Sequence, residues 1–335
     1  MPISIIIPTF NRSASLQITL ASLLALKSLS RDHEIIVVDN ASTDDTQTVT
    51  EAAIKSAPNC IIRYYYEPIP GLLSGRHKGA LESKCDILIY IDDDIDVDSG
   101  WLNAIEETFD DPQVHLVGGK NLPRYESPPP DWLEAFWYRD GPRSWCDYLS
   151  VLDFGEQPSE IDSLFIWGLN FSIRRKTLFD VGGFHPDYIP KPFECYQGNA
   201  ETGLAWKAKA IGFKIVYQPK ALIHHRIPTE RLTLDYFERR NFLYGINDSY
   251  TTIRRNRGIK FDWKMQEPLP AARRLLRRIA SRLSKDPYAA IKQKVHEAWI
   301  RGYLFHQKKA REDPELLEWV LRENYWDYRY GPFKI

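Results

Sequence analysis

Short apolar runs alternate with segments of helical periodicity over the first third of the chain. The runs are rich in Ile, Val and Tyr, and the segments between them carry apolar side chains at every third or fourth position. Strands that alternate with helices form βαβ units, and uniformly apolar strands are covered on both faces. We therefore expect an α/β fold with a mostly parallel sheet. The expected strands are 4–7, 34–39, 61–66 and 87–91, and the expected helices begin near 13, 43, 74 and 101.

The later part of the chain has a different pattern. Residues 123–160 are irregular and rich in Pro and Trp, and loops of that length usually serve as lids or binding loops. Beyond them we expect strands at 163–175 and 214–217, and helices at 176–181, 201–211, 233–256 and 269–325. The pattern predicts an α/β domain at 1–256 and a helical C-terminal region at 257–335.

Formal charge nearly cancels over the 335 residues, with 44 Lys and Arg against 45 Asp and Glu. The balance hides an asymmetry, because residues 254–311 hold 17 Lys and Arg but only 4 Asp and Glu. Residues 271–283 alternate apolar and basic pairs, which predicts a basic amphipathic helix. Peripheral membrane contact through 257–335 and packing on the body or on a second copy both remain open. Nucleic acid is not an expected partner, because no binding motif accompanies the charge.

Three further observations bear on location. The first expected strand leaves no room for a signal peptide, and no apolar run approaches the ~20 residues that span a bilayer. The four cysteines form no CxxC pair, which argues against a zinc site and a disulfide scaffold. We expect a cytoplasmic protein, either free or at the inner face of the membrane.

Polar residues gather where the expected strands end. One strand ends in Pro8-Thr9-Phe10-Asn11-Arg12, another in Asp39-Asn40, and a third in Asp92-Asp93-Asp94. Ligands of such sheets bind beyond the carboxyl ends of the strands. Three adjacent carboxylates repel one another unless cations neutralise them, and Mg²⁺ or Mn²⁺ is commonly held by carboxylates together with substrate phosphates. The sequence has neither GxGxxG nor GxxxxGK[ST], which argues against dinucleotide and P-loop sites.

Together these motifs resemble family 2 glycosyltransferases of the GT-A fold. The resemblance spans about residues 3–250 and rests on 5–12, 36–44, 91–94, 168–175 and 181–184. It implies a Rossmann-like, mostly parallel sheet flanked by helices, with a helical C-terminal extension. It also implies an inverting, metal-dependent enzyme that takes a sugar from a nucleotide sugar, UDP-linked by preference, with Mn²⁺ or Mg²⁺ as cofactor.

The resemblance assigns the donor site residue by residue. Asp39 matches the aspartate that binds the nucleotide base, with Asn40 beside it, and Arg76 in the segment 71–79 would approach the nucleotide. Asp92 and Asp93 would face the ribose and the metal, and Asp94 would be the direct metal ligand. Of the adjacent His224 and His225 only one can complete the metal site, and the spacing from Pro219 favours His224. The first nucleotide loop would use Pro8, Thr9, Asn11 and Arg12.

On the acceptor side the resemblance points to Glu201 as the general base, which would take the proton of an acceptor hydroxyl. The family usually has an acidic pair there, but Ala200 occupies the first position, and Glu194 is a rival base. Aromatic faces stack on sugars, so Trp132, Trp137, Trp145 and above all Trp167 are candidates for contacts with the acceptor.

The implied role is polysaccharide or glycoconjugate biosynthesis, with a saccharide or lipid-linked acceptor. Two other classes stay open. One is a sugar nucleotidyltransferase, although the Gly-rich basic loop that such enzymes carry near the N-terminus is absent. The other is a non-catalytic carbohydrate-binding or scaffold protein, which Ala200 in place of an acid would suit.

Overall fold

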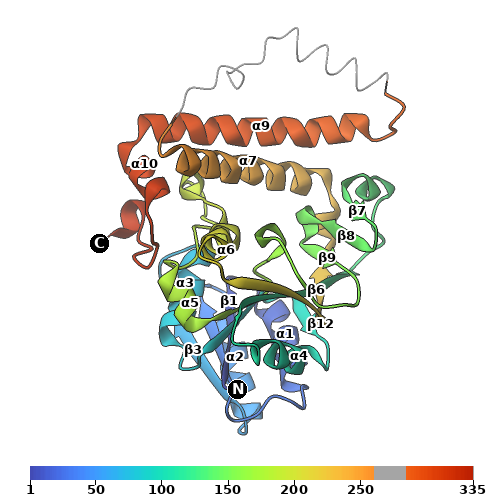
Figure 1. Ribbon diagram of the computed structural model, residues 1–335, viewed down its shortest axis with the longest axis vertical. Coiled ribbons are helices and arrows are strands. Elements are labelled where there is room, and N and C mark those ends of the chain that lie inside the picture. The colour runs from blue at the N-terminus through green and yellow to red at the C-terminus, as the bar shows by residue number, and fades with distance from the viewer. Residues whose placement is uncertain (260–283, 335) are drawn as a thin grey trace.

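The computed structural model describes residues 1–259 and 284–334, and its elements form a mixed sheet with helices on both faces (Figure 1). The strands are β1 (Ile3–Thr9), β2 (Glu34–Asp39), β3 (Ile61–Tyr66), β4 (Ile87–Ile91), β5 (Ile95–Val97), β6 (Val114–Tyr125), β7 (Tyr138–Asp140), β8 (Arg143–Cys146), β9 (Val151–Asp153), β10 (Ser159–Glu160), β11 (Asn170–Arg174) and β12 (Lys214–Ile227). The helices are α1 (Ser13–Leu24), α2 (Thr46–Ser56), α3 (Leu72–Glu82), α4 (Trp101–Phe109), α5 (Arg175–Asp180), α6 (Ala200–Ala210), α7 (Leu234–Asn256), α9 (Ala289–Glu312) and α10 (Pro314–Leu321).

The N-terminal half of the sheet is parallel, as the pattern predicted. Its strands lie in the order β3-β2-β1-β4. Successive residues point to opposite faces, so Ile5 and Ile35 pack with α1 and α4, whereas Ile6 and Ile36 pack with α3. Gly79 allows α3 to approach closely, because a Cβ there would lie 2.3 Å from Ile6 Cγ2. The parallel strands bring their carboxyl ends to one edge.

Beyond β4 the sheet is mixed. β11 runs antiparallel between β4 and β6, and β12 runs parallel to β6. β12 continues far past the predicted end at Tyr217, because Pro219 falls at an irregularity in the pairing with β6, where no ladder donor is required. The strand expected at 163–175 is shorter than predicted, since Ser163–Phe165 form a 3-10 turn and only Asn170–Arg174 pair.

The Pro- and Trp-rich stretch is partly ordered as a ribbon. Strands β7, β8 and β9 pair antiparallel, and β9 joins them to β6. Trp132 and Trp137 pack in a hydrophobic cluster with Phe136 and Phe237. These two indoles therefore serve packing of the ribbon against α7, while Trp145 and Trp167 line a cavity beneath it.

The C-terminal helices lie on the α/β body. Figure 1 shows α7 and α9 side by side above the sheet, with α10 and the C-terminus at one end. Trp319, Tyr325 and Tyr330 belong to the same core cluster as Ile6 and Tyr90, and Tyr330 Oη donates to Pro70 O at 2.6 Å. The expected basic helix at 271–283 lies outside the described residues.

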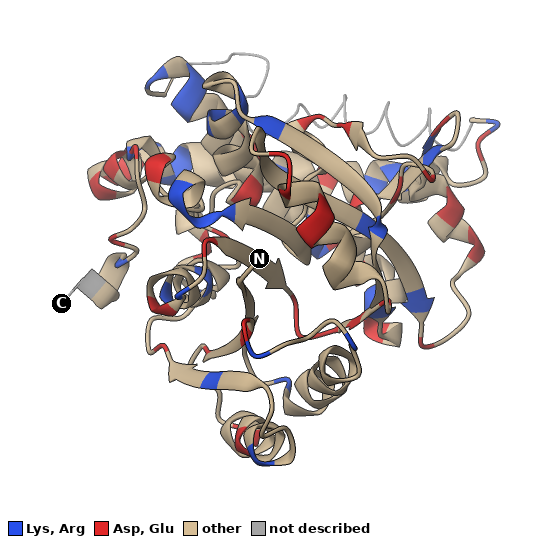
Figure 2. Cartoon of the chain, turned by 60° about the horizontal axis from the view of Figure 1, so that its bottom comes forward, with Lys and Arg blue, Asp and Glu red and all other residues tan. Residues whose placement is uncertain are grey.

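Charge is distributed on the outside of this body. In Figure 2 basic and acidic positions are interspersed along the helices and loops. Among the described residues, no helix combines the length and the apolar character needed to cross a membrane.

The contact between α7 and α9 depends on two glycines, and this gives a first prediction. A Cβ on Gly245 would lie 2.1 Å from Trp299 O, and one on Gly302 would lie 1.9 Å from Phe242 O. Gly245→Ala must therefore push the helices apart, and we expect it to destabilise the fold by about 1–3 kcal/mol in chemical denaturation.

Gly100→Ala is the matched control, because the nearest atom to its added Cβ is 3.6 Å away. Equal stability of the two variants would contradict the close-packing account.

Candidate donor and acceptor sites

The carboxyl ends of β1, β2 and β4 bring the predicted donor residues together. Thr9 pairs in register with Asp39 across β1 and β2, and the acidic triplet follows β4 directly. Thr9 Oγ1 donates to Asp93 Oδ2 at 2.7 Å, and Arg12 Nη1 donates to Asp93 Oδ1 at 2.6 Å. Asp93 thus has both oxygens engaged within the protein, and it ties the loop after β1 to the end of β4.

Asp94 is the most heavily compensated carboxylate of the triplet. Its Oδ2 accepts from Arg12 at 2.9 Å and from Arg231 at 2.8 Å, and it lies 3.4 Å from His225 Nε2. Burial alone would raise the pKa of Asp94, but His225, Arg231 and Arg12 together hold that pKa well below its usual range. Its other oxygen, Oδ1, is buried without a hydrogen-bond partner among the described residues.

His225, rather than the expected His224, lies beside Asp94. Neighbouring residues of a strand point to opposite faces, and His225 points inward, where it is 2% exposed. His225 Nδ1 lies 2.8 Å from Leu149 O, so we assign a proton to Nδ1, while Nε2 lies 2.8 Å from Arg231 Nη1. The expectation that favoured His224 over His225 rested on the spacing from Pro219, which does not allow for the irregularity in β12.

The donor set fits a divalent cation shared with a phosphate. Asp94 Oδ1 is buried with no hydrogen-bond partner in the described part of the chain, and the His225 imidazole lies close by, with Arg231 Nη1 at its Nε2. Over residues 1–259 and 284–334, no group of three or more His, Cys, Asp and Glu side chains is arranged to hold a metal. Mg²⁺ commonly uses one or two protein ligands and completes its shell with water and substrate phosphates.

Asp39 and Asn40 organise the loops at the carboxyl end of β2. Asp39 Oδ1 accepts from Ser42 N at 2.8 Å, and its Oδ2 accepts from Tyr64 Oη at 2.7 Å. Asn40 is buried and donates to Ile69 O, so it holds the segment that leads into α3. Asn11 has a left-handed backbone, with φ of 52°, and its side chain accepts from Thr43 N. Pro8 is buried at the end of β1, against α3.

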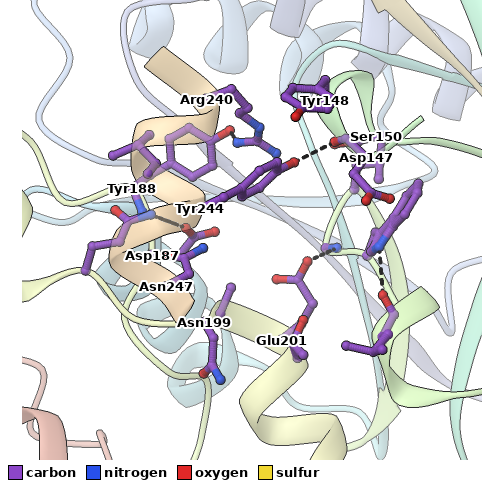
Figure 3. Close-up of a pocket in the computed structure, with 18 of the residues that line it drawn as sticks. Asp147, Tyr148, Ser150, Asp187, Tyr188, Asn199, Glu201, Arg240, Tyr244 and Asn247 are labelled. Carbon is purple, nitrogen blue, oxygen red and sulfur yellow. Dashed lines mark hydrogen bonds between the residues drawn. The ribbon is translucent and has the colours of Figure 1, made fainter. Parts of the chain in front are cut away.

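A cavity of about 610 Å³ opens beside this edge and contains Glu201 (Figure 3). Glu201 Oε2 lies 3.0 Å from Arg76 Nη1, and its Oε1 accepts from Gly168 N at 2.8 Å. Arg76 is buried and needs the glycine, because a Cβ on Gly168 would lie 1.8 Å from Arg76 Nη2. Arg76 and Asp92 line the same cavity, so it connects the donor edge with Glu201.

Of the other candidates for the acceptor side, some line the cavity and one does not. Glu194 lies in a 3-10 turn and does not line the cavity. Ala200 does line it, with a left-handed φ of 47°, at the first turn of α6. Trp145 and Trp167 also line the cavity, and Trp167 Nε1 donates to Leu164 O at 3.0 Å. Aromatic faces beside a carboxylate suit a saccharide, which presents both C–H faces and hydroxyl groups.

Sequence analysis missed three carboxylates that line this cavity, Asp147, Asp187 and Asp248. Asp187 lies near Glu201 in Figure 3, and its Oδ1 accepts from Gln197 Nε2 at 3.1 Å. Its loop is hydrogen-bonded to the start of α6, since His185 N donates to Ala200 O and Gly198 N donates to Pro186 O. Asp187 therefore supplies an acid to the region where Ala200 replaces one. No local motif marks it, because only the pairing of the two loops brings it there.

Comparison with known proteins identifies the family. The model of "Glycosyl transferase family 2" matches residues 4–177, about half of the chain. The chain belongs to glycosyl transferase family 2.

Curated relatives of this family 2 member are distant. A glucosyl-dolichyl phosphate glucuronosyltransferase of Haloferax volcanii is 25% identical over 52% of this chain and 54% of its own length. A pre-mycofactocin glycosyltransferase of Mycobacterium tuberculosis is 23% identical over 72% of this chain and 46% of its own. The chain thus spans about half the length of the curated relatives it matches.

Solved structures confirm the GT-A fold of the family 2 chain. The mannosyltransferase PcManGT from Pyrobaculum calidifontis, solved with GDP-Man and Mn²⁺, superimposes with a TM-score of 0.57 at 17% identity, over 94% of this chain and 88% of that one. S. aureus TarS 1–349, solved with UDP-GlcNAc, gives 0.51 at 13% identity, over 93% and 92% of the two chains. At these identities the likeness concerns the fold.

Asp187 gives a prediction on stability. Burial raises its pKa to about 7, Glu201 adds to that rise, and Arg76 and Arg240 oppose it. A raised carboxyl pKa contributes stability that is complete below the unfolded value near pH 4 and is lost as pH rises through about 7. Asp187→Asn removes the ionisation while it keeps an acceptor for Gln197. We expect it to be more stable than wild type at pH 8, by roughly 1–3 kcal/mol, with a smaller difference at pH 5.

The measurement is thermal unfolding at both pH values. Asp180→Asn, on an exposed carboxylate of α5, is the control and should show no such dependence on pH. Equal loss of stability at both pH values in Asp187→Asn would contradict the buried-acid account.

Proposed function

We propose that this protein is an inverting glycosyltransferase, which moves a sugar from a nucleoside-diphosphate sugar to an acceptor hydroxyl. The observation that carries the proposal is the single cavity that joins Asp92 and Arg76 of the donor edge to Glu201. Family membership and the GT-A neighbours support the reaction class. We propose a UDP-linked donor by preference. One solved neighbour holds a guanine nucleotide sugar and another holds a uracil nucleotide sugar, so the nucleobase of the donor is to be identified by titration with nucleotides.

In the donor half, Asp39 and the loop of Thr9, Asn11 and Arg12 would hold the nucleoside. Asp94 and His225 would hold Mn²⁺ or Mg²⁺, which supplies positive charge to the diphosphate as it leaves. Arg231 lies within hydrogen-bond distance of both Asp94 and His225. Its guanidinium is suited to the same diphosphate, because Arg binds phosphate oxygens in pairs.

In the acceptor half, Glu201 would accept the proton of the attacking hydroxyl. The acceptor oxygen then forms a bond to the anomeric carbon, and the bond from that carbon to the diphosphate oxygen breaks, with its electron pair leaving on the diphosphate. Attack from the opposite face inverts the anomeric centre in one displacement. Arg76 and Gly168 N fix the Glu201 carboxylate by two contacts, so the protein orients the base before substrate binds.

The acceptor is proposed as a saccharide or a lipid-linked saccharide in polysaccharide or glycoconjugate synthesis. Trp145 and Trp167 provide the stacking surface. A curated relative is named for a dolichyl-phosphate-linked acceptor, which makes a lipid-linked substrate worth testing first. Contact with the cytoplasmic face of a membrane, or with a second copy through 257–335, remains part of the proposal.

Glu201→Gln tests the base. The amide keeps the size of the side chain but cannot take a proton, so we expect turnover to fall by ~10²–10⁴-fold with donor binding retained. Turnover is measured as release of the nucleotide, and donor binding by calorimetry. Glu194→Gln is the matched control, because Glu194 lies outside the cavity. Full activity in Glu201→Gln would remove Glu201 from the role.

The metal site is tested by the two adjacent histidines. We expect His225→Gln to weaken Mn²⁺-dependent nucleotide binding by about 10–100-fold, because replacing residues around a bound metal ion commonly lowers its affinity by that factor. His224→Gln should leave it unchanged, since His224 is on the other face of β12.

UDP, GDP, CDP and dTDP are each titrated by calorimetry with and without Mn²⁺. One nucleotide bound in a Mn²⁺-dependent way identifies the donor class. Equal effects of the two substitutions would contradict the assignment of His225.

A further inference from the structure

A second cavity, of about 640 Å³, adjoins the one that contains Glu201. It lies between α6, the end of α7 and the segment after α10. Asn199, Trp206 and Thr251 line both cavities, so the second begins where the acceptor cavity ends. Its charged lining is four cations and one carboxylate among the described residues: Lys207, Arg254, Arg255, Arg257 and Glu323.

The carboxylate compensates this charge poorly. Glu323 lies 3.9 Å from Lys207 Nζ and 4.0 Å from Arg254 Nη2, at the outer limit of an ion pair. Its side chain is 87% exposed, so its charge is largely screened by water. The cavity therefore retains net positive charge within the part of the chain that the structure describes.

Some of these cations form hydrogen bonds that hold the fold together, and others do not. Arg254 donates to Val320 O and Arg322 O at the end of α10, and Lys207 Nζ donates to Val181 O at 3.3 Å and to Glu323 O, which leaves one of its three N–H groups for a ligand. Arg255 and Arg257 are exposed and form no salt bridge within residues 1–259 and 284–334. Arg255 lies over the ring of Trp206, with its central carbon 4.7 Å from the ring centre, which orders the guanidinium without neutralising it.

The surroundings of Lys207 disfavour its charged form. Burial lowers the pKa of Lys207, and the nearby Arg254 lowers it further. A bound anion would offset both effects, since it replaces lost solvation and separates like charges. A phosphate group suits this geometry best, because it carries up to two charges and several acceptor oxygens for guanidinium and ammonium donors.

We propose that Lys207, Arg255 and Arg257 form a phosphate-binding pocket next to the acceptor cavity. This goes beyond the proposed glycosyl transfer, because binding of phosphate there requires no donor and no turnover. The position of the pocket suits that reaction. The pocket would hold a phosphate group of the acceptor, or a free phosphate compound, beyond Trp206, while a hydroxyl of the acceptor reaches Glu201.

Calorimetric titration with inorganic pyrophosphate tests the pocket. We expect wild type to bind it and the double variant Arg255→Gln/Arg257→Gln to bind at least ~10-fold more weakly, since two charge-assisted contacts are removed. Both side chains are exposed, so the variant should fold, which thermal unfolding verifies. Lys209→Gln is the matched control, because Lys209 is on the same helix but pairs with Asp162 outside the pocket.

Equal affinity in the double variant and in wild type would overturn the proposal, and so would absence of binding to wild type at millimolar pyrophosphate. The assay contains neither nucleotide sugar nor divalent cation, so the proposed cation-dependent donor site does not report in it and a failure of the proposed transfer does not affect it.

A second arm identifies the source of the phosphate. Phosphatidylcholine vesicles with and without phosphatidic acid are sedimented with wild type and with the double variant. Binding that needs phosphatidic acid, Arg255 and Arg257 supports a lipid phosphate. Pyrophosphate binding without vesicle binding supports a soluble phosphate compound.

Discussion

Burying consecutive carboxylates at the end of a strand requires cations, and the positions of those cations determine much of this molecule. Asp93 and Asp94 are nearly inaccessible, so each must be paired or lose its charge. Arg12 reaches them from the start of α1, and Arg231 reaches Asp94 from the turn after β12. Segments far apart in sequence thus meet at one point. The end of β4 therefore joins several segments of the fold through ion pairs, and it is also the position that we propose for the cation and the diphosphate.

Arg76 links the end of β4 to the acceptor cavity. Arg76 is buried, interacts electrostatically with both Asp92 and Glu201, and makes a direct ion pair with Glu201. Arg76 therefore lies between the carboxylates at the end of β4 and the carboxylate of Glu201.

Features that depend on local sequence pattern could be predicted from the sequence. Alternating runs located the parallel strands, and the polar residues at their ends are adjacent because parallel strands share an edge. Glu201 was found through a motif at the start of a helix, and it does line the cavity. The sequence named His224 and His225 as alternatives and favoured His224, because a count from Pro219 does not detect the irregularity in β12 that changes which residues face inward. Asp187 was missed because its place depends on hydrogen bonds between two loops.

Helix α7 was expected at the end of the α/β domain and the later helices beyond it, and the contacts of these helices give them a role in shaping the cavity. α7 contributes Arg240 and Tyr244 to the wall of the acceptor cavity, and α9 holds α7 through the close approach at Gly245 and Gly302. Tyr328 Oη donates to Glu67 Oε2, and Tyr325 N donates to Gly182 O, so the last described residues fasten the loops before α3 and after α5. Those loops precede Arg76 and Asp187. A displacement of the C-terminal segment would therefore be transmitted to the charged groups around Glu201 by packed backbone.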